Sequence, residues 1–425
     1  MSESLAEILN RDCRCVSFDL AALDRETRAL LGDSSVGLPV WSTSLFAAVP
    51  VFVSREDLAM MRDTILAVDS LVRSPKYRER VLAHAPEIAR HDVSQRGVYF
   101  GYDFHLGELG PALIEINTNA GGPLLNLLLA RAQTHCDEME QLELAGGSLE
   151  QLESEFVAMF RREWVLARGN RPLRSIAIVD DEPEKQFLYS EFLLFQSLFQ
   201  NAGLKAFVLR PEQLQLRPEG LYFGEEPIDL VYNRLVDFYL AEPAHQTIRD
   251  AYLADTVVVT PHPQAHALYA NKRNLITLRD LTLHEAVGLS QVQSQQLLAH
   301  IPETQLVEAV DAERLWSERK RWFFKPLHGY GGKAAYRGDK LTRATFAEIL
   351  GKDYVVQRNV APSQRHVEVG GSVVPLKLDL RCFVYDTSIQ LVAARLYHGQ
   401  TTNFRTAGGG FAPVFSEINP GRSDP

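Results

Sequence analysis

The sequence predicts an α/β (α+β) protein in which one chain carries both a parallel and an antiparallel sheet. Strands alternate with helices over residues 170–255, which favours a small doubly wound parallel domain. Two alternating strands near the C-terminus are separated by only three residues, which is typical of an antiparallel hairpin. With 425 residues, of which 46% are hydrophobic, the chain is long enough to form two or three domains.

Three segments are expected to have different element contents. Residues 1–145 are expected to be a mainly helical region that contributes one strand, residues 146–255 the small α/β domain, and residues 256–425 a mixture of helices and strands. The expected helices span 54–72 (with Ser54 as N-cap), 124–139, 149–167 and 184–202 (closed by Gly203), and the expected strands span 112–116, 174–179, 204–209, 228–232, 256–260, 322–325, 354–357, 376–385 and 389–397.

The charge distribution excludes several classes of partner. The net charge is −10, and no block of Lys and Arg is present, so we expect neither a nucleic acid nor an anionic membrane as partner. No apolar stretch reaches the roughly 18 residues of a membrane-spanning helix, and the first residues lack the apolar segment of a signal peptide. We therefore expect a cytoplasmic protein whose four cysteines are ordinary thiols. A homodimer is compatible with the sequence.

A glycine-rich segment follows a predicted strand in the last third of the chain. The segment Pro326–Lys333 reads PLHGYGGK and comes directly after Lys325. Gly329, Gly331 and Gly332 allow backbone N–H groups to turn toward phosphate oxygens. A tight β-turn explains the same residues without any ligand, so this segment alone does not decide between the two interpretations.

Charged and polar residues follow on the next predicted strands. Asp379 and Arg381 in KLDLR are two residues apart, so both side chains point to one face of a strand. Arg395 ends the second strand of the hairpin, and Asn403 and Arg405 precede three glycines. An acid beside arginines suits a site for Mg²⁺ and phosphate. A solvated sheet face and a surface loop remain the alternatives.

A third motif lies far from these in the chain. Glu115 and Asn117 in LIEINTNAGG end an apolar strand and share one face of it. Carboxylate and amide oxygens are hard ligands of the kind that Mg²⁺ accepts, and the two following glycines allow the backbone to approach a substrate. The alternative is an ordinary polar strand end.

Taken together, these motifs resemble the ATP-grasp superfamily. Its members carry a lysine-bearing strand before a glycine-rich lid, a hinge strand that holds adenine, a D-x-R strand, an arginine and an asparagine further on, and an E-x-N strand that ordinarily comes last. Here Glu115 and Asn117 precede Asp379, an order that resembles the circularly permuted branch, which includes eukaryotic-type glutathione synthetase. The similarity covers about residues 95–415 and implies an ATP-grasp fold with circularly permuted motif order.

The resemblance implies how ATP would be held. Lys272, in NKRN, and Lys325 would contact its phosphates, and a lid over about residues 325–350 would close above them through the three glycines named above. The segment from Gln357 to Val360 would form the hinge and contact the adenine edge through its backbone.

The resemblance also implies metal, catalytic and substrate-binding residues. Two Mg²⁺ ions would be bound by oxygen ligands, and arginines would neutralise the transferred phosphoryl group. The segment VYNRLVDFYL resembles a substrate-domain motif, in which Arg234 would contact a carboxylate or phosphate, unless it forms a surface ion pair with Asp237. The implied metal ligands are Glu115, Asn117 and Asp379, the catalytic residues are Arg381, Arg395 and Arg405, and the substrate contacts are Arg234 and Asn403.

Three positions depart from the glutathione synthetase pattern, and one of them is Lys333, which would add a phosphate contact in the lid. Gly329 stands where that family carries an acidic metal ligand, so Asp379 would have to supply this charge. No arginine stands beside Asp103, where the glutathione enzyme places a substrate-binding one. We therefore do not expect glutathione itself as the product.

The implied activity is an ATP-dependent ligase. It would join a small-molecule or peptide carboxylate to an amine in an amide bond, or alternatively to a thiol, through an acyl-phosphate intermediate, releasing ADP and phosphate. Both the attacking carboxylate and ATP are anions, so Mg²⁺, Lys and Arg must offset their repulsion. A kinase or phosphotransferase of the same superfamily, and a non-catalytic ATP-binding module, are the alternatives.

Overall fold

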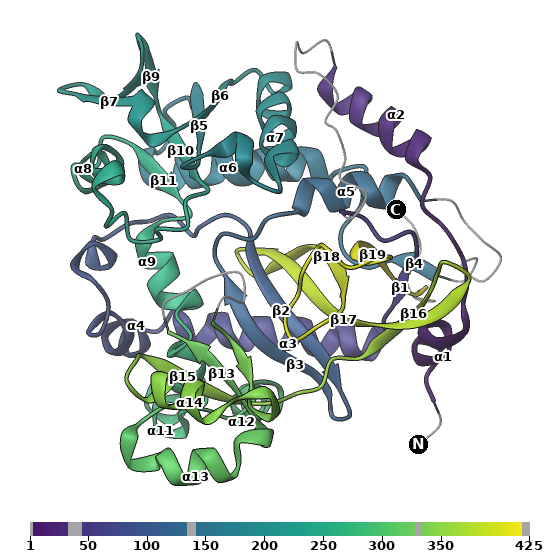
Figure 1. Ribbon diagram of the computed structural model, residues 1–425. Coiled ribbons are helices and arrows are strands. Elements are labelled where there is room, and N and C mark those ends of the chain that lie inside the picture. Colours follow the sequence, from purple (N-terminus) through teal and green to yellow (C-terminus); the bar gives the residue numbers. More distant parts are fainter. Residues whose placement is uncertain (1–2, 33–44, 134–141, 328–333, 419–425) are drawn as a thin grey trace.

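A large, mainly antiparallel sheet occupies the centre of the molecule (Figure 1). The computed structural model describes residues 3–32, 45–133, 142–327 and 334–418. Within them the order of the strands is β1-β19-β18-β17-β2-β3, with β16 beside β17 and β4 beside β19. The strands are β1 (Val51–Phe52), β2 (Phe100–Gly107), β3 (Gly110–Asn117), β4 (Leu142–Leu144), β16 (Gln364–Val369), β17 (Ser372–Tyr385), β18 (Ser388–Tyr397) and β19 (Gly410–Glu417). Residues from both ends of the chain therefore build one sheet.

One face of this sheet is covered by helix α3 (Arg55–Val72). Ser54 caps the helix as expected, because its hydroxyl accepts a hydrogen bond from the N–H of Asp57 at 3.0 Å. Leu378 and Leu380 of β17 lie in the same apolar core as the inward side of α3. The residues of β17 that alternate with these leucines point to the opposite face of the sheet. Their polar side chains can therefore take part in a binding site.

The predicted parallel α/β unit is present, with strand order β11-β10-β5-β6. Alternate strand residues enter two different cores, one with α6 and α7 and one with α8, so helices cover both faces of the sheet. The elements are β5 (Ser175–Val179), β6 (Lys205–Leu209), β10 (Leu230–Asn233), β11 (Val258–Thr260), α6 (Leu152–Arg168), α7 (Tyr189–Asn201) and α8 (Gln246–Leu253). A small antiparallel sheet, β7 (Leu214–Arg217), β8 (Gly220–Phe223) and β9 (Glu226–Ile228), extends from it.

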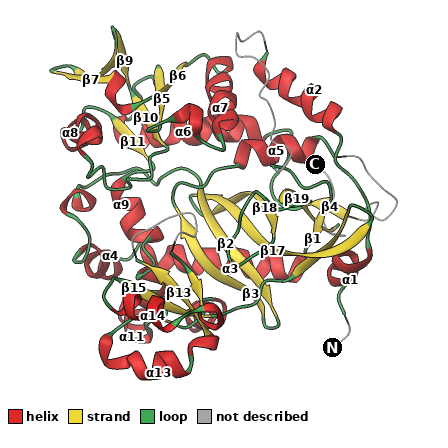
Figure 2. Ribbon diagram, in the orientation of Figure 1, coloured by secondary structure: helices red, strands yellow, loops and turns green. Residues whose placement is uncertain are grey.

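A further antiparallel sheet, ordered β12-β15-β13-β14, lies beside the central one, and its position among the helices is clearest in Figure 2. Its strands are β12 (Thr304–Leu306), β13 (Trp322–Pro326), β14 (Tyr336–Arg337) and β15 (Tyr354–Arg358). The remaining helices are α1 (Leu5–Asp12), α2 (Leu20–Leu31), α4 (Pro75–Leu82), α5 (Pro123–Arg131), α9 (Pro263–Ala265), α10 (Asn274–Thr277), α11 (Leu281–Val287), α12 (Gln291–His300), α13 (Ala312–Ser317) and α14 (Arg343–Leu350).

The structure differs from the sequence-based expectations in several details. Helix α7 begins at Tyr189 rather than at 184, because a short 3-10 turn starts at Pro183 and the chain then extends at Gln186. The hairpin turn between β17 and β18 has two residues rather than three, Asp386 and Thr387, both at positive φ as in a two-residue hairpin loop.

The cysteines also depart in part from the expectation. Cys15 is disulfide-bonded rather than a free thiol, whereas Cys13 and Cys382 are free and buried. Among the described helices none is both long and apolar enough to cross a membrane.

Candidate functional site

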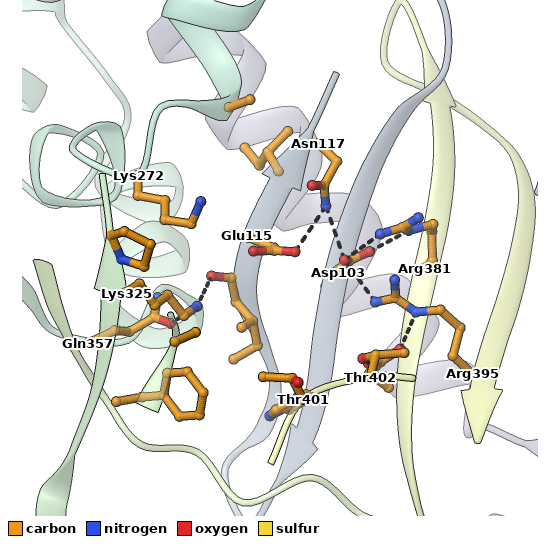
Figure 3. A pocket seen from close by; sticks show the side chains of 18 of the residues that line it. Asp103, Glu115, Asn117, Lys272, Lys325, Gln357, Arg381, Arg395, Thr401 and Thr402 are labelled. Atoms are coloured by element: carbon orange, nitrogen blue, oxygen red, sulfur yellow. Dashed lines mark hydrogen bonds and ion pairs between the residues drawn. The ribbon is translucent and has the colours of Figure 1, made fainter. Parts of the chain in front are cut away.

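A cavity of about 540 Å³ opens beside the polar face of the central sheet. Strands β2, β3, β17 and β18 form one wall, and β13 with the end of β15 forms another. In Figure 3 the amines of Lys272 and Lys325 lie on one side and the guanidinium groups of Arg381 and Arg395 on the other, with Glu115 between them. The predicted site residues that line this cavity are Glu115, Asn117, Lys272, Lys325, Gln357, Val360, Asp379, Arg381 and Arg395.

Strand register explains why these residues meet. Asp379 is paired with Arg395 across β17 and β18, and Arg381 is paired with Asp103 across β17 and β2. Asp103 is in turn paired with Glu115 on β3. Opposite residues of neighbouring strands point to the same face, so the charges lie on one face of four strands, in two neighbouring rows.

Asp103 connects the two rows. Its carboxylate is 3% exposed and accepts two hydrogen bonds from Arg381, both at 2.7 Å, and one from Arg395 at 2.8 Å. Burial alone would raise the pKa of Asp103, but the two guanidinium groups outweigh it and lower the pKa to about 2. Arg395 also donates to Asp379 at 2.6 Å, and Thr402 donates to the other oxygen of Asp379 at 2.5 Å.

A glycine on the same strand makes room for this network. Gly101 lies opposite Asn117, and a Cβ at Gly101 would stand 3.0 Å from Nε of Arg381 and 2.8 Å from Cβ of Ala120. A larger residue there would push the guanidinium away from Asp103.

Lys325 projects from β13 into the opposite wall. Its amine is buried and donates to the carbonyl of Ile114 at 3.0 Å and to Oε1 of Gln357 at 2.7 Å. Burial lowers the pKa of Lys325 to about 8. Below Gln357, the carbonyl of Val360 lies 2.8 Å from Nδ1 of His105, which fixes the end of the predicted hinge against β2.

The end of the cavity nearest the parallel sheet is formed by uncharged groups and one histidine. His266 stacks on Phe238 with ring centres 3.9 Å apart, and its Nδ1 lies 3.2 Å from the hydroxyl of Thr118. Phe238 follows β10, whereas Thr118 follows β3, so this wall joins the α/β unit to the central sheet.

Comparisons with known proteins agree with this architecture. No protein-family model matches the chain, and no curated protein gives a significant match. Among solved structures, a glutathione synthetase-like effector from Globodera pallida in its apo form has a TM-score of 0.58 at 12% identity, covering 94% of this chain and 98% of its own. The chain has a glutathione synthetase-like, ATP-grasp-type fold.

Two more distant structures are also similar. A putative gamma-glutamylcysteine synthetase from Methylobacillus flagellatus KT has a TM-score of 0.48 at 11% identity, covering 88% of this chain and 91% of its own. The ATP-grasp ligase PsnB, complexed with a minimal precursor, has a TM-score of 0.31 at 11% identity, covering 59% of this chain and 92% of its own. Their TM-scores are too low to support any further conclusion.

Three of the predicted site residues lie outside the cavity lining of this ATP-grasp-type fold. Arg234 is buried instead of forming a surface ion pair; its guanidinium donates to the carbonyl of Ala120 at 3.4 Å and the hydroxyl of Tyr232 at 3.2 Å. Asn403 bonds within its own loop, to the carbonyl of His398 at 2.7 Å, and Arg405 is exposed. Their substrate and catalytic roles remain predictions. The lid glycines Gly329, Gly331 and Gly332 lie outside the described residues.

The two glycines after Asn117 contact protein groups. Gly121 and Gly122 are buried, and the N–H of Gly122 donates to Glu191 at 2.8 Å. Gly122 has φ +106°, and a Cβ there would stand 2.6 Å from the ring of Phe411. The absence of a side chain at these glycines therefore lets their segment pack closely against neighbouring parts of the protein. Neither glycine lines the cavity.

The donor atoms of the cavity fit Mg²⁺ and ATP. Glu115 and Asn117 offer carboxylate and amide oxygens of the kind that Mg²⁺ binds, and two lysines face them. In the described chain, Nε2 of Gln357 is buried with no hydrogen-bond partner, which leaves a donor for a ligand in this wall. No group of three or more His, Cys, Asp or Glu side chains suited to a metal occurs in the described segments.

Sequence reasoning assigned no role to Asp103. The strand FGYDFHLG alternates, with Phe100, Tyr102 and Phe104 in the apolar core and Asp103 and His105 on the cavity side. This alternation with a period of two is visible in the sequence and could have placed Asp103 on the polar face of a strand. Thr402, which donates to Asp379, carried no comparable signal because it lies in a loop.

Proposed function

We propose that this protein is an ATP-dependent ligase that forms an amide bond between a carboxylate and an amine, with its ATP-grasp motifs in circularly permuted order. The observation that carries the proposal is the shared cavity, which is lined by Glu115 and Asn117 on β3, by Asp379 on β17, and by Lys272 and Lys325. Along the chain, Asn117 is separated by 155 positions from Lys272, the next of these residues.

Each wall would have its own task. Lys272 and Lys325 would bind the phosphates of ATP, and Gln357 to Val360 would hold the adenine. Glu115, Asn117 and Asp379 would hold two Mg²⁺ ions, which would offset the negative charge of the phosphates. In Figure 3 the two lysines lie on one side of the cavity, and Glu115 lies between them and the arginines.

The reaction would join two anions before an amine enters. A substrate carboxylate oxygen would attack the γ-phosphorus of ATP, giving an acyl phosphate and ADP. Arg381 and Arg395, held in place by buried carboxylates, would offset the charge of the transferred phosphoryl group. An amine would then attack the acyl carbon and release phosphate. The enclosing walls would keep water from the acyl phosphate.

A two-substrate assay tests this function. The full chain is incubated with Mg-ATP and pools of carboxylates and amines, and ADP and free phosphate are measured. We expect both products only when a carboxylate and an amine are present together. Phosphorylation of one acceptor without free phosphate would instead indicate a kinase, and ATP binding without turnover would indicate a binding module.

A variant of the metal-facing carboxylate makes the assay specific. Glu115→Gln removes a charged oxygen ligand and should lower turnover at least about 100-fold, the scale of losing one directly placed electrostatic group. Glu108→Gln, at the exposed turn of the same hairpin, is the matched control and should retain activity. Full activity of Glu115→Gln, with an unchanged melting temperature, would contradict the metal assignment.

A further inference from the structure

A buried carboxylate outside all predicted ligand sets touches three of the proposed site residues. Asp103 is 3% exposed and receives hydrogen bonds from Arg381, Arg395 and Asn117. We propose that Asp103 is a positioning residue, which fixes these two arginines and turns the amide oxygen of Asn117 toward the magnesium site. This inference rests on the proposed function.

The arginine contacts fix geometry as well as charge. Nε and Nη2 of Arg381 donate to the two oxygens of Asp103, a paired arrangement that sets the plane of the guanidinium. Arg395 bridges Asp103 and Asp379 and is thereby held between two strands. In the described chain no other carboxylate pairs with Arg381, so its orientation depends on Asp103.

The amide contact determines which atom of Asn117 reaches the cavity. Its nitrogen donates to Asp103 at 3.1 Å and to Glu115 at 3.2 Å, so the nitrogen faces the row of carboxylates. In Figure 3 its oxygen lies on the side of the amide that is nearer Lys272. Without the Asp103 carboxylate, the amide loses one of the two acceptors that hold this orientation, and the oxygen is no longer fixed for Mg²⁺.

Partners of this kind, one step behind a metal ligand, typically change metal affinity 10- to 100-fold when removed. We therefore expect Asp103→Asn to weaken Mg²⁺ binding to the full chain saturated with a non-hydrolysable ATP analogue by about 10- to 100-fold, measured by calorimetric titration. Binding of the analogue in the presence of a chelator should not weaken, because the lysines are unchanged. Asp69→Asn, which removes the acid of another Asp–Arg pair whose residues do not line the cavity, is the matched control and should leave both affinities unchanged.

A second variant separates position from charge. Asp103→Glu keeps the negative charge that the arginines need but moves it by one methylene. If Asp103 acted only as a charge, this variant would bind Mg²⁺ like the wild type; we expect it to bind several-fold more weakly. It also carries the test if Asp103→Asn fails to fold.

A double-mutant cycle tests the route through Asn117. In an Asn117→Ala background, Asp103→Asn should cause little further loss of Mg²⁺ affinity, because the positioned amide is already absent. Additive losses, or wild-type Mg²⁺ affinity in both Asp103 variants, would overturn the inference and leave the ligase proposal standing. A wild-type chain that binds the analogue without any Mg²⁺ dependence would overturn both.

Discussion

At the scale of single residues, the chain neutralises its buried charges in cross-strand pairs. Arg381 and Asp103 are both nearly inaccessible, as are Arg395 and Asp379, and each pair is directly opposite in the sheet. Buried ion pairs of this kind add little to the net free energy of folding, and their main effect is to fix the orientation of both side chains. Removing one partner is nevertheless costly, because the other charge is then buried without a counter-charge. The arginines are thus held ready at one end of the cavity, whereas the lysines face them from the other.

Lys325 gives a prediction about pH. Its pKa of about 8 means that the amine is cationic below pH 8 and loses its charge as the pH rises further. We expect the affinity for Mg²⁺ and an ATP analogue to fall above about pH 8, by at most about tenfold per pH unit for one proton. Calorimetric titrations between pH 7 and pH 9.5 would measure this.

The matching variants identify the group responsible. In Lys325→Gln the affinity should be lower at pH 7 and should no longer follow this titration, whereas Lys340→Gln, at an exposed lysine, should behave like the wild type. A pH profile of Lys325→Gln parallel to that of the wild type would assign the dependence to another group.

Single residues differ in how far the sequence reveals them. Glu115, Asp379 and Lys325 stand in motifs whose spacing already predicts a shared face or a strand end, and all three line the cavity. Asp103 and Thr402 do not stand in such motifs, because their importance comes from partners on other strands. Arg405 stands beside glycines that suggest a ligand loop; its side chain is exposed, and its catalytic role stays a prediction.

At the scale of elements, the loop after β10 is fastened to helix α8. His245, which is inaccessible to solvent, lies 2.8 Å from Asp237 and 2.7 Å from Asp181 through its two ring nitrogens. Asp237 stands between Val236 and Phe238, both of which line the cavity. The clamp therefore holds one wall of the candidate site in place.

This clamp should make stability depend on pH. Burial would lower the pKa of His245, but the two aspartates outweigh it and raise the pKa to about 9. Because the folded value lies above the unfolded value of about 6.5, the stabilisation is complete below about pH 6.5 and is lost as the pH rises through about 9. His245→Gln should lower the free energy of unfolding by about 2 kcal/mol at pH 7, measured by urea denaturation.

The difference between variant and wild type should shrink at pH 10, where the wild-type histidine is neutral. His84→Gln, at an exposed histidine, should match the wild type at both pH values. A difference that stays constant from pH 7 to pH 10 would exclude the charged clamp.

Most elements follow from local sequence patterns, whereas their ends do not. The alternating strands β17 and β18 and the capped helix α3 lie where the pattern predicts them. The start of α7 shifts by five residues because Pro183 favours a short turn before the helix. Strand β11 joins the parallel sheet although it begins after residue 255, since its register with β10 is a tertiary contact.

At the scale of the whole molecule, Glu163 joins the α/β unit to the central sheet. It lies on α6, is inaccessible, and accepts hydrogen bonds from the N–H groups of Arg96 and Gly97, from Thr260 at the end of β11 and from Tyr385 at the end of β17. Four donors from three separate segments thus converge on one carboxylate.

Replacing this carboxylate should destabilise the chain as a whole. Glu163→Gln places an N–H₂ group against groups that are themselves donors, and we expect the free energy of unfolding to fall by about 3 kcal/mol. Glu153→Gln, on the same helix with a partly exposed ion pair to Arg131, should cost less than about 1 kcal/mol. If urea denaturation gave equal losses of unfolding free energy in both variants, the four hydrogen bonds to Glu163 would stabilise the fold no more than a partly exposed ion pair does.

The sequence alone determined the local periodicity, the helix caps and the chemical character of each motif, because these depend on residues a few positions apart. The tertiary structure decided which motifs share a cavity and which partner each charge has. The contact of Arg381 with Asp103 spans 278 positions and that of Lys325 with Ile114 spans 211. The first contact depends on strand register across a sheet assembled from both ends of the chain, and the second depends on how two sheets pack against each other. Spacing within one motif carries no information about either.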